Sequence, residues 1–128
     1  MVTGLYFALF GFWLAFLFLR IVKIRTTQKI AFGQGGNQDM VRAQSVHSNF
    51  VETVPFILVL MIVLEWQGMY PAWVIHLVGL TMVASRIAHF IGIHQGTGTG
   101  IWRVVAGVSF ITLLLIGSCL ALYQAIAG

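Results

Sequence analysis

Four apolar stretches, each about as long as a bilayer is thick, constrain the fold of this chain more than any other feature. A membrane-spanning helix needs about 20 mostly apolar residues. Such stretches cover roughly residues 2–25, 40–66, 71–94 and 101–127, which together account for most of the 128 residues. The sequence therefore predicts an all-α membrane protein with a single domain over residues 1–128, built as a bundle of four transmembrane helices.

The scarcity of charged side chains supports the same conclusion. Charged residues make up 8% of the chain and hydrophobic residues 59%, whereas a soluble domain usually carries about 25% charged residues. So few charges cannot cover a water-facing surface of this size, and membrane lipid is the expected solvent. The net charge of +4 arises from only seven Lys and Arg residues, which form no solvated stripe, so we expect no nucleic-acid partner.

The basic side chains all belong to one side of the predicted bundle. Arg42 opens the second span, Arg86 lies late in the third and Arg103 opens the fourth, while four more follow the apolar part of the first span: Arg20, Lys23, Arg25 and Lys29. Cytoplasmic loops are enriched in Lys and Arg. The first and third connections are therefore predicted to be cytoplasmic and both termini to lie outside. The third connection, residues 95–100, lacks the Lys-Ser/Thr of a phosphate-binding loop and is predicted to be a flexible hairpin.

A stripe of polar residues runs along the second predicted span. Arg42, Asn49 and Glu52 are seven and three residues apart, which places them on one helical face. An isolated carboxylate in a membrane is costly, so Glu52 is expected to be paired or protonated. Arg86 is its first candidate partner, ahead of Arg42 and Arg103. A purely structural network that holds the helices together in lipid is the competing interpretation.

Three polar side chains outside this stripe are predicted to have structural roles. Glu65 ends the second span, where a solvated charge is expected. His76 stands alone on the third span and is expected to be packed or interfacial, and Cys119 lies in an apolar run, where a buried thiol is expected. The histidines predict no metal site, because no His-x-x-x-His pair occurs and no set of ligands converges.

The polar residues of the last three spans form a recognisable pattern. Its members are Arg42, Asn49, Glu52 and Pro55 on the second span, Arg86 and His89 on the third, and Arg103 at the start of the fourth. This pattern resembles the MAPEG family, the membrane-associated proteins in eicosanoid and glutathione metabolism, and the helix spacing agrees over essentially the whole chain. The segment Ser48 to Pro55, followed by Leu64-Glu65-x-x-Gly68, is most similar to the short bacterial branch.

The resemblance implies a homotrimer in the bacterial inner membrane, with glutathione as co-substrate between neighbouring subunits near the cytoplasmic face. It implies that Arg103 is the catalytic residue, because a nearby guanidinium favours the glutathione thiolate. It also implies glutathione-binding roles for further residues: Arg25, Lys29, Arg42, Asn49, Glu52, Arg86 and His89. Attack of the thiolate on an apolar electrophile or a lipid hydroperoxide from the bilayer would make the protein a glutathione transferase or peroxidase.

Two departures from the family pattern keep a second function open. Active members usually carry Arg where Ser45 stands, and many carry Tyr where Ile93 stands, so a carboxylate anchor and a hydroxyl donor are missing. These losses favour a non-catalytic lipid-binding or scaffold protein on the same fold, and whether the chain is an enzyme stays open. A small multidrug transporter is disfavoured, because the first span contains no Asp or Glu.

Overall fold

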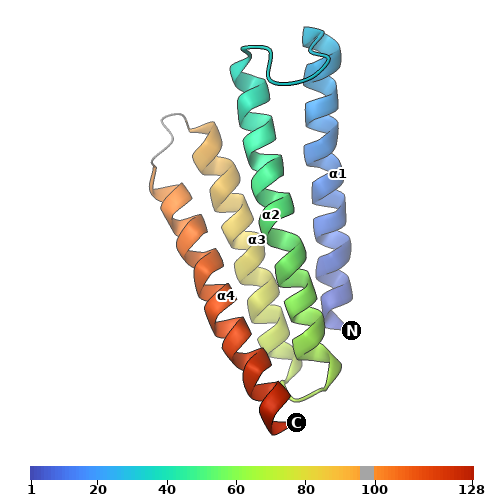
Figure 1. The fold of residues 1–128 in the computed structure, drawn as a ribbon, viewed down its shortest axis with the longest axis vertical. Helices are drawn as coiled ribbons and strands as arrows, with labels where there is room; N and C mark the ends of the chain where they lie inside the picture. Colours follow the sequence, from blue (N-terminus) through green and yellow to red (C-terminus); the bar gives the residue numbers. More distant parts are fainter. Residues whose placement is uncertain (96–99) are drawn as a thin grey trace.

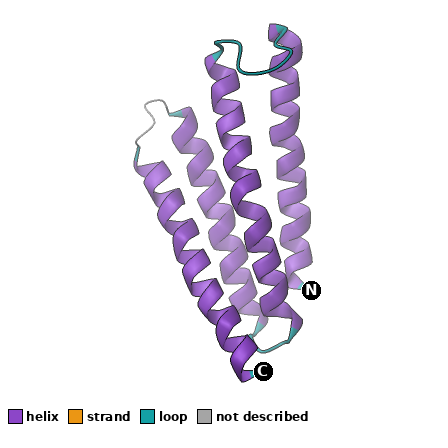
Figure 2. Cartoon of the chain, in the orientation of Figure 1, coloured by secondary structure: helices purple, strands orange, loops and turns teal. Residues whose placement is uncertain are grey.

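The chain folds into four long helices joined by short connections in the computed structural model, which describes residues 1–95 and 100–128 (Figure 1, Figure 2). The helices are α1 (Val2–Gln28), α2 (Gln38–Trp66), α3 (Ala72–His94) and α4 (Ile101–Ala127). Each is long and apolar enough to cross a membrane, which agrees with the predicted all-helical bundle. The flexible hairpin predicted at residues 95–100 lies mostly outside the described residues, which do not include 96–99.

Two helix ends differ slightly from the predicted ones. α2 begins at Gln38 because the side chain of Asn37 accepts a hydrogen bond from the backbone N–H of Met40 at 3.0 Å. Asn is a favoured residue for this capping role. α1 continues one turn further than predicted, to Gln28, and ends where Lys29 adopts a left-handed conformation with φ of 54°. The connection between α1 and α2 is therefore shorter than the sequence suggested.

Helices α2 and α3 form the middle of the bundle, and α1 and α4 flank them (Figure 1). Within the described residues, α1 and α4 each pack against both central helices and do not touch each other. The large side chains on the outward faces of α1 and α4 are mostly Phe, Leu, Ile and Val, which lipid solvates well. Cys119 lies on the exposed surface of α4, so the prediction of a buried thiol is wrong, because α4 has few neighbours to cover it.

The up-and-down path of the chain gathers the basic residues at one end. The first connection, the end of α3 and the start of α4 lie at this end, whereas both termini and the connection between α2 and α3 lie at the other (Figure 1). We call the first of these the basic end, defined by Arg20, Lys23, Arg25, Lys29, Arg42, Arg86 and Arg103. Arg86 is buried within α3 and so brings part of this charge into the bundle.

At the opposite end, Glu65 joins the last turn of α2 to the first turn of α1. Its carboxylate accepts hydrogen bonds from the backbone N–H groups of Val2 and Thr3, the latter at 2.8 Å. The first amides of a helix have no partner within the helix and favour a negative charge. The carboxylate predicted to be a solvated end charge is instead a helix cap, because α1 begins beside the end of α2.

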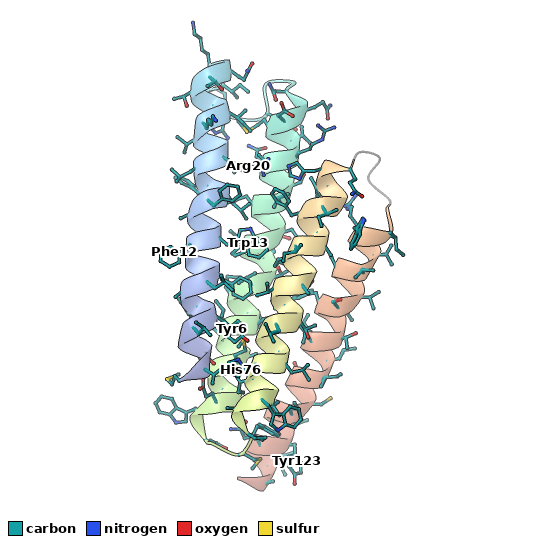
Figure 3. The ribbon with its side chains drawn as sticks, turned by 180° about the vertical axis from the view of Figure 1, so that it is seen from behind. Tyr6, Phe12, Trp13, Arg20, His76 and Tyr123 are labelled. Atoms are coloured by element: carbon teal, nitrogen blue, oxygen red, sulfur yellow. The ribbon has the colours of Figure 1, made fainter. Side chains whose placement is uncertain are left out.

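A tyrosine–histidine contact fixes α1 against α3 (Figure 3). The hydroxyl of Tyr6 lies 3.0 Å from Nδ1 of His76 and donates to the His76 carbonyl at 3.2 Å. The Tyr6 ring is buried, and Gly79 leaves room for it, because a Cβ at position 79 would overlap the ring. His76 is therefore a packed histidine, as predicted.

The close approach of Tyr6 to α3 makes Gly79 sensitive to substitution. We expect Gly79→Ala to lower the free energy of unfolding by about 1–3 kcal/mol, because overpacking forces the Tyr6 ring to move. Gly11→Ala is the matched control, since no atom lies within 4 Å of its added Cβ, and it should be neutral or stabilising by up to about 1 kcal/mol. Unfolding in detergent micelles measures both; equal losses would contradict the proposed contact.

Candidate functional site

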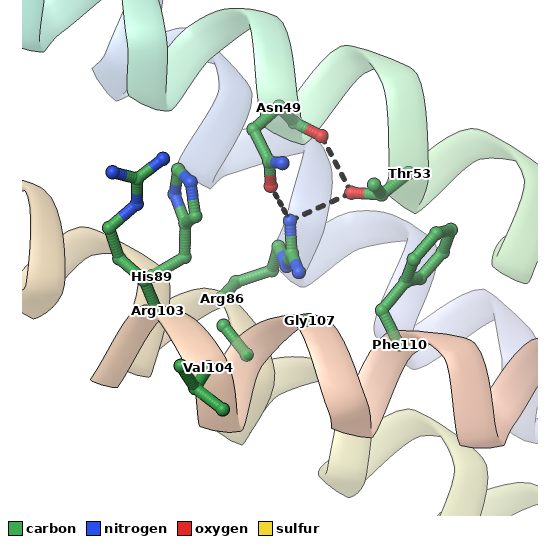
Figure 4. A pocket seen from close by; sticks show the side chains of 9 residues that line it. Asn49, Thr53, Arg86, His89, Arg103, Val104, Gly107 and Phe110 are labelled. Atoms are coloured by element: carbon green, nitrogen blue, oxygen red, sulfur yellow. Dashed lines mark hydrogen bonds between the residues drawn. The ribbon is translucent and has the colours of Figure 1, made fainter. Parts of the chain in front are cut away.

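A cavity of about 390 Å³ lies between α2, α3 and α4, in the half of the bundle nearest the basic end (Figure 4). Small-molecule sites commonly enclose about 300–1,000 Å³. Polar and basic side chains line one part of it and small or apolar ones the rest: Asn49, Thr53, Arg86, His89, Arg103, Val104, Ala106, Gly107 and Phe110. A polar cavity between membrane spans is a candidate binding site, because such groups are costly in lipid.

The guanidinium of Arg86 is the centre of this cavity's polar network (Figure 4). Arg86 is 4% exposed. Its Nη1 donates to the side-chain oxygen of Asn49 and, at 2.9 Å, to the hydroxyl of Thr53. Its Nη2 donates to the hydroxyl of Ser85 at 2.9 Å, and Ser85 in turn donates to the carbonyl of Ala106 at 2.9 Å. One cation thereby links α2, α3 and α4.

The network does not use all of the hydrogen-bonding capacity of Arg86. Its guanidinium carbon lies 5.9 Å from the centre of the Phe110 ring, within the range of a cation–π contact. Its Nε atom is buried and has no hydrogen-bond partner among the described residues. A buried donor without an acceptor is unfavourable, so an anionic or carbonyl group in the cavity would be stabilised there.

His89 and Arg103 line the same cavity and add an imidazole and a second guanidinium to it. His89 lies one turn after Arg86 on α3 and is 9% exposed, while Arg103 lies in the first turn of α4. Figure 4 shows both side chains at the same end of the cavity, away from Phe110. The approach of the two helices depends on Gly92, where an added Cβ would lie 2.7 Å from Cγ of Arg103. Glycine at this position therefore helps to place Arg103 over the cavity.

Glu52 lies outside this network. It is exposed on α2, and in the part of the chain that the structure describes it has no hydrogen-bond or ion-pair partner. The predicted pairing of Glu52 with Arg86 is wrong within one subunit, because Asn49 and Thr53, four residues apart, form the face of α2 that meets α3. Glu52 falls beyond the edge of that face and points away from the bundle core.

The three other predicted glutathione ligands do not line this cavity. Arg42 lies in the second turn of α2, where its Nη1 is 3.6 Å from the carboxylate of Asp39. Arg25 donates to the carbonyl of Gly33 at 3.2 Å and so supports the connection between α1 and α2. Lys29 is the exposed residue that ends α1. The structure therefore brings together Asn49, Arg86, His89 and Arg103, and places these three elsewhere in the subunit.

Both departures from the family pattern have structural consequences. The hydroxyl of Ser45 donates to the carbonyl of Val41 at 2.8 Å, so it is engaged within its own helix. Ile93 packs against the hydrophobic core. Neither position therefore offers a polar group to the cavity.

Three residues of the network were not predicted from the sequence: Thr53, Ser85 and Phe110. Thr53 could have been predicted from the sequence, because it lies one turn after Asn49 on the same face of α2. Ser85 and Phe110 could not have been predicted, because serine and phenylalanine are common in membrane spans. No group of three or more His, Cys, Asp or Glu residues is arranged to hold a metal ion in the described ranges.

The contact of Thr53 with Arg86 should be measurable as stability. We expect Thr53→Val, which removes only the hydroxyl, to lower the free energy of unfolding by about 1–2 kcal/mol, the usual upper range for a hydrogen bond in a membrane. Thr112→Val makes the same replacement on the exposed face of α4. It should change the free energy of unfolding by less than about 0.5 kcal/mol. Equal effects in a denaturant titration would argue against the network.

Comparison with known proteins places this geometry in a family. Residues 3–123 match the MAPEG family. The chain is 33% identical over 95 residues to the inner membrane protein YecN of Escherichia coli strain K12 and equally to that of strain CFT073, which covers 74% of this chain and 72% of each relative. No solved structure matches. With its four apolar helices, this chain is a multi-pass bacterial inner membrane protein that belongs to the MAPEG family.

Proposed function

We propose that the cavity binds glutathione as its thiolate, and that the protein is a membrane transferase or peroxidase that acts on apolar electrophiles or lipid hydroperoxides. The observation that carries this proposal is the buried Arg86, held by Asn49 and Thr53 beside His89 and Arg103. Family membership supports it, because glutathione metabolism is part of the family's description. The cavity's position between spans gives both a polar and an apolar reactant access to it.

The cavity's side chains suit the polar parts of glutathione. The tripeptide carries two carboxylates, one ammonium group and amides at neutral pH. The unsatisfied Nε of Arg86 can donate to a carboxylate or carbonyl oxygen, and Asn49 can bond an amide. Arg103 lines the part of the cavity nearest the basic end. There its guanidinium would stabilise the glutathione sulfur as a thiolate.

The chemical step needs only an activated thiol and an apolar reactant. The thiol loses its proton, and the thiolate then attacks the electrophilic carbon, so an S–C bond forms as the leaving group departs with its electrons. With a hydroperoxide, the thiolate attacks the terminal oxygen, the O–O bond breaks and the lipid alcohol is released. The thiol of a second glutathione then attacks the sulfenic sulfur, so that the S–O bond breaks, the disulfide forms and water is released. The role assigned to Arg103 is to favour the thiolate in both cases.

The exposed Glu52 supports a homotrimer with sites between subunits. A carboxylate without a partner on a membrane-spanning helix is costly, and a neighbouring copy that covers it would remove this cost. Arg25 and Lys29, which lie away from their own subunit's cavity, would then face the neighbour's glutathione. In this arrangement Glu52 would bind the glutathione ammonium group and Arg42 would add to the field that attracts its carboxylates.

We also infer the orientation of the protein in the membrane, from the distribution of its Lys and Arg residues. The positive-inside rule places the basic end in the cytoplasm and both termini outside. Glutathione would then enter from the cytoplasm, and the apolar reactant would enter from the bilayer.

A non-catalytic lipid-binding or scaffold role is the second candidate. It is favoured by Ser45, whose hydroxyl bonds its own helix, and by Ile93, which packs in the core. Two lost polar contacts would weaken glutathione binding by several kcal/mol at about 1.5–3 kcal/mol each. A lipid that copurifies in the cavity, together with no turnover of any electrophile, would favour this candidate over the first.

Arg103 is the residue to test for thiolate stabilisation. Titration of the purified protein with glutathione at neutral pH should produce the ultraviolet absorption of a thiolate. Arg103→Ala should reduce that band about tenfold or more, since a neighbouring cation lowers a pKa by 1–3 units, and Arg103→Lys should keep part of it. Absence of both binding and the band in the unaltered protein would refute the proposal.

Gly107 allows the cavity to be blocked with little effect on the fold. It lines the cavity, and no atom lies within 4 Å of a Cβ added there. We expect Gly107→Leu to abolish glutathione binding in calorimetry, because its side chain occupies the ligand's space. Gly4→Leu, at an equally open position on α1, should bind like the unaltered protein. Normal binding by the Gly107 variant would show that glutathione binds elsewhere.

A further inference from the structure

A second cavity, of about 320 Å³, lies at the basic end between α1, α2 and α3. Its lining is mostly charged and differs entirely from that of the candidate glutathione site among the described residues: Arg20, Lys23, Ile24, Asp39, Arg42 and His94. The two cavities share no cation: Arg86 and Arg103 line the first, whereas Arg20, Lys23 and Arg42 line the second. The function proposed above makes no use of Arg20, Lys23 or His94.

This second cavity is positively charged. Arg20, Lys23 and Arg42 contribute three cations, and Asp39 is the only acidic residue that lines it within the described residues. Asp39 lies 3.6 Å from Arg42, so it offsets the charge of that arginine and leaves the charges of Arg20 and Lys23 uncompensated. An anion in this cavity would meet at least two cations from α1 and a third from α2.

Arg20 is held in place by aromatic neighbours on α3 (Figure 3 labels Arg20). Its guanidinium carbon lies 5.2 Å from the centre of the Phe90 ring, and its Nη2 lies 2.8 Å from Nε2 of His94. Nδ1 of His94 is 2.8 Å from the carbonyl of Phe90, so Nδ1 carries the proton and Nε2 accepts from Arg20. The contact with His94 fixes the direction of the guanidinium.

One donor of this fixed guanidinium is unused. Nη1 of Arg20 is buried and has no hydrogen-bond partner among the described residues. The Lys23 side chain, one turn further along α1, is exposed and can reach into the same space. The guanidinium of Arg20 is held in one orientation and has an unused donor, and the ammonium group of Lys23 beside it is flexible. Together these two groups can bind the oxygens of a phosphate.

We propose that this cavity binds the phosphate of an anionic phospholipid headgroup. Arg20 lies where the apolar part of α1 ends, which is the depth at which lipid phosphates lie in a membrane. Basic pockets between spans on the cytoplasmic side bind anionic headgroups in other membrane proteins. Ile24, the apolar member of the lining, suits the glycerol or acyl part of a lipid better than a free ion. Arg20 donates to a phosphate oxygen, and Lys23 neutralises the remaining negative charge.

Native mass spectrometry of the protein in a neutral detergent tests this proposal. The fraction of protein that carries dioctanoyl phosphatidylglycerol is compared with the fraction that carries dioctanoyl phosphatidylcholine over a titration. We expect tighter binding of phosphatidylglycerol, and we expect Lys23→Gln to weaken it about fivefold, as the loss of one cation near a lipid surface predicts. Arg20→Gln should weaken it further, and Lys23→Gln keeps the test valid if the Arg20 variant does not fold.

Lys29→Gln is the matched control, because it removes the same charge from the same end of α1 at a position outside the cavity. It should bind phosphatidylglycerol like the unaltered protein. Equal losses in the Lys23 and Lys29 variants would mean diffuse attraction and overturn the proposal. Equal binding of the two lipids would also overturn it.

Two competing anions test whether the anion bound in this cavity is a lipid headgroup, a free phosphate or glutathione. Inorganic phosphate at high concentration should displace bound phosphatidylglycerol, because both offer phosphate oxygens. Binding of inorganic phosphate without a preference for phosphatidylglycerol over phosphatidylcholine would overturn the assignment to lipid. Glutathione should not displace the lipid, since the two cavities are separate; displacement would mean that its carboxylates occupy this cavity instead.

Discussion

The arrangement of the bundle depends on the solvation of one buried cation. A guanidinium inside a membrane has no water to bond, so protein oxygens must take its place. For Arg86 these are the side chains of Asn49 and Thr53 on α2 and Ser85 on its own helix, which is itself bonded to the backbone of α4. The three helices must therefore meet at this depth, and the cavity is the space that their polar faces leave between them.

The basic end serves more than one purpose in this bundle. Arg25 supports a loop through the carbonyl of Gly33, Arg86 and Arg103 line one cavity, and Arg20 lines another. Loop charges fix the orientation of a membrane protein by their number alone. The intramembrane arginines instead depend on position, because each requires particular oxygen or aromatic partners within reach.

Helix positions could be predicted from the sequence, whereas most side-chain partners could not. Apolar length places the spans, and the spacing of Arg42, Asn49 and Glu52 places them on one side of α2. The spacing does not reveal how far around α2 the contact with α3 extends. This contact includes Thr53 but not Glu52. The partner of Glu65 was equally hidden, because a helical period carries no information about which helix end lies beside it.

The cap that Glu65 provides has a consequence for how the chain enters the membrane. The amide of Val2 and its acceptor, Glu65, are 63 residues apart in the sequence. If α1 enters the bilayer before α2, the residue that completes its first turn does not yet lie beside it. The start of α1 must therefore remain hydrated, or bonded to headgroups, until α2 has crossed and brought its carboxylate to the same side. Assembly of α1 and α2 in the membrane is therefore complete only when α2 has crossed the bilayer and Glu65 bonds the first amides of α1.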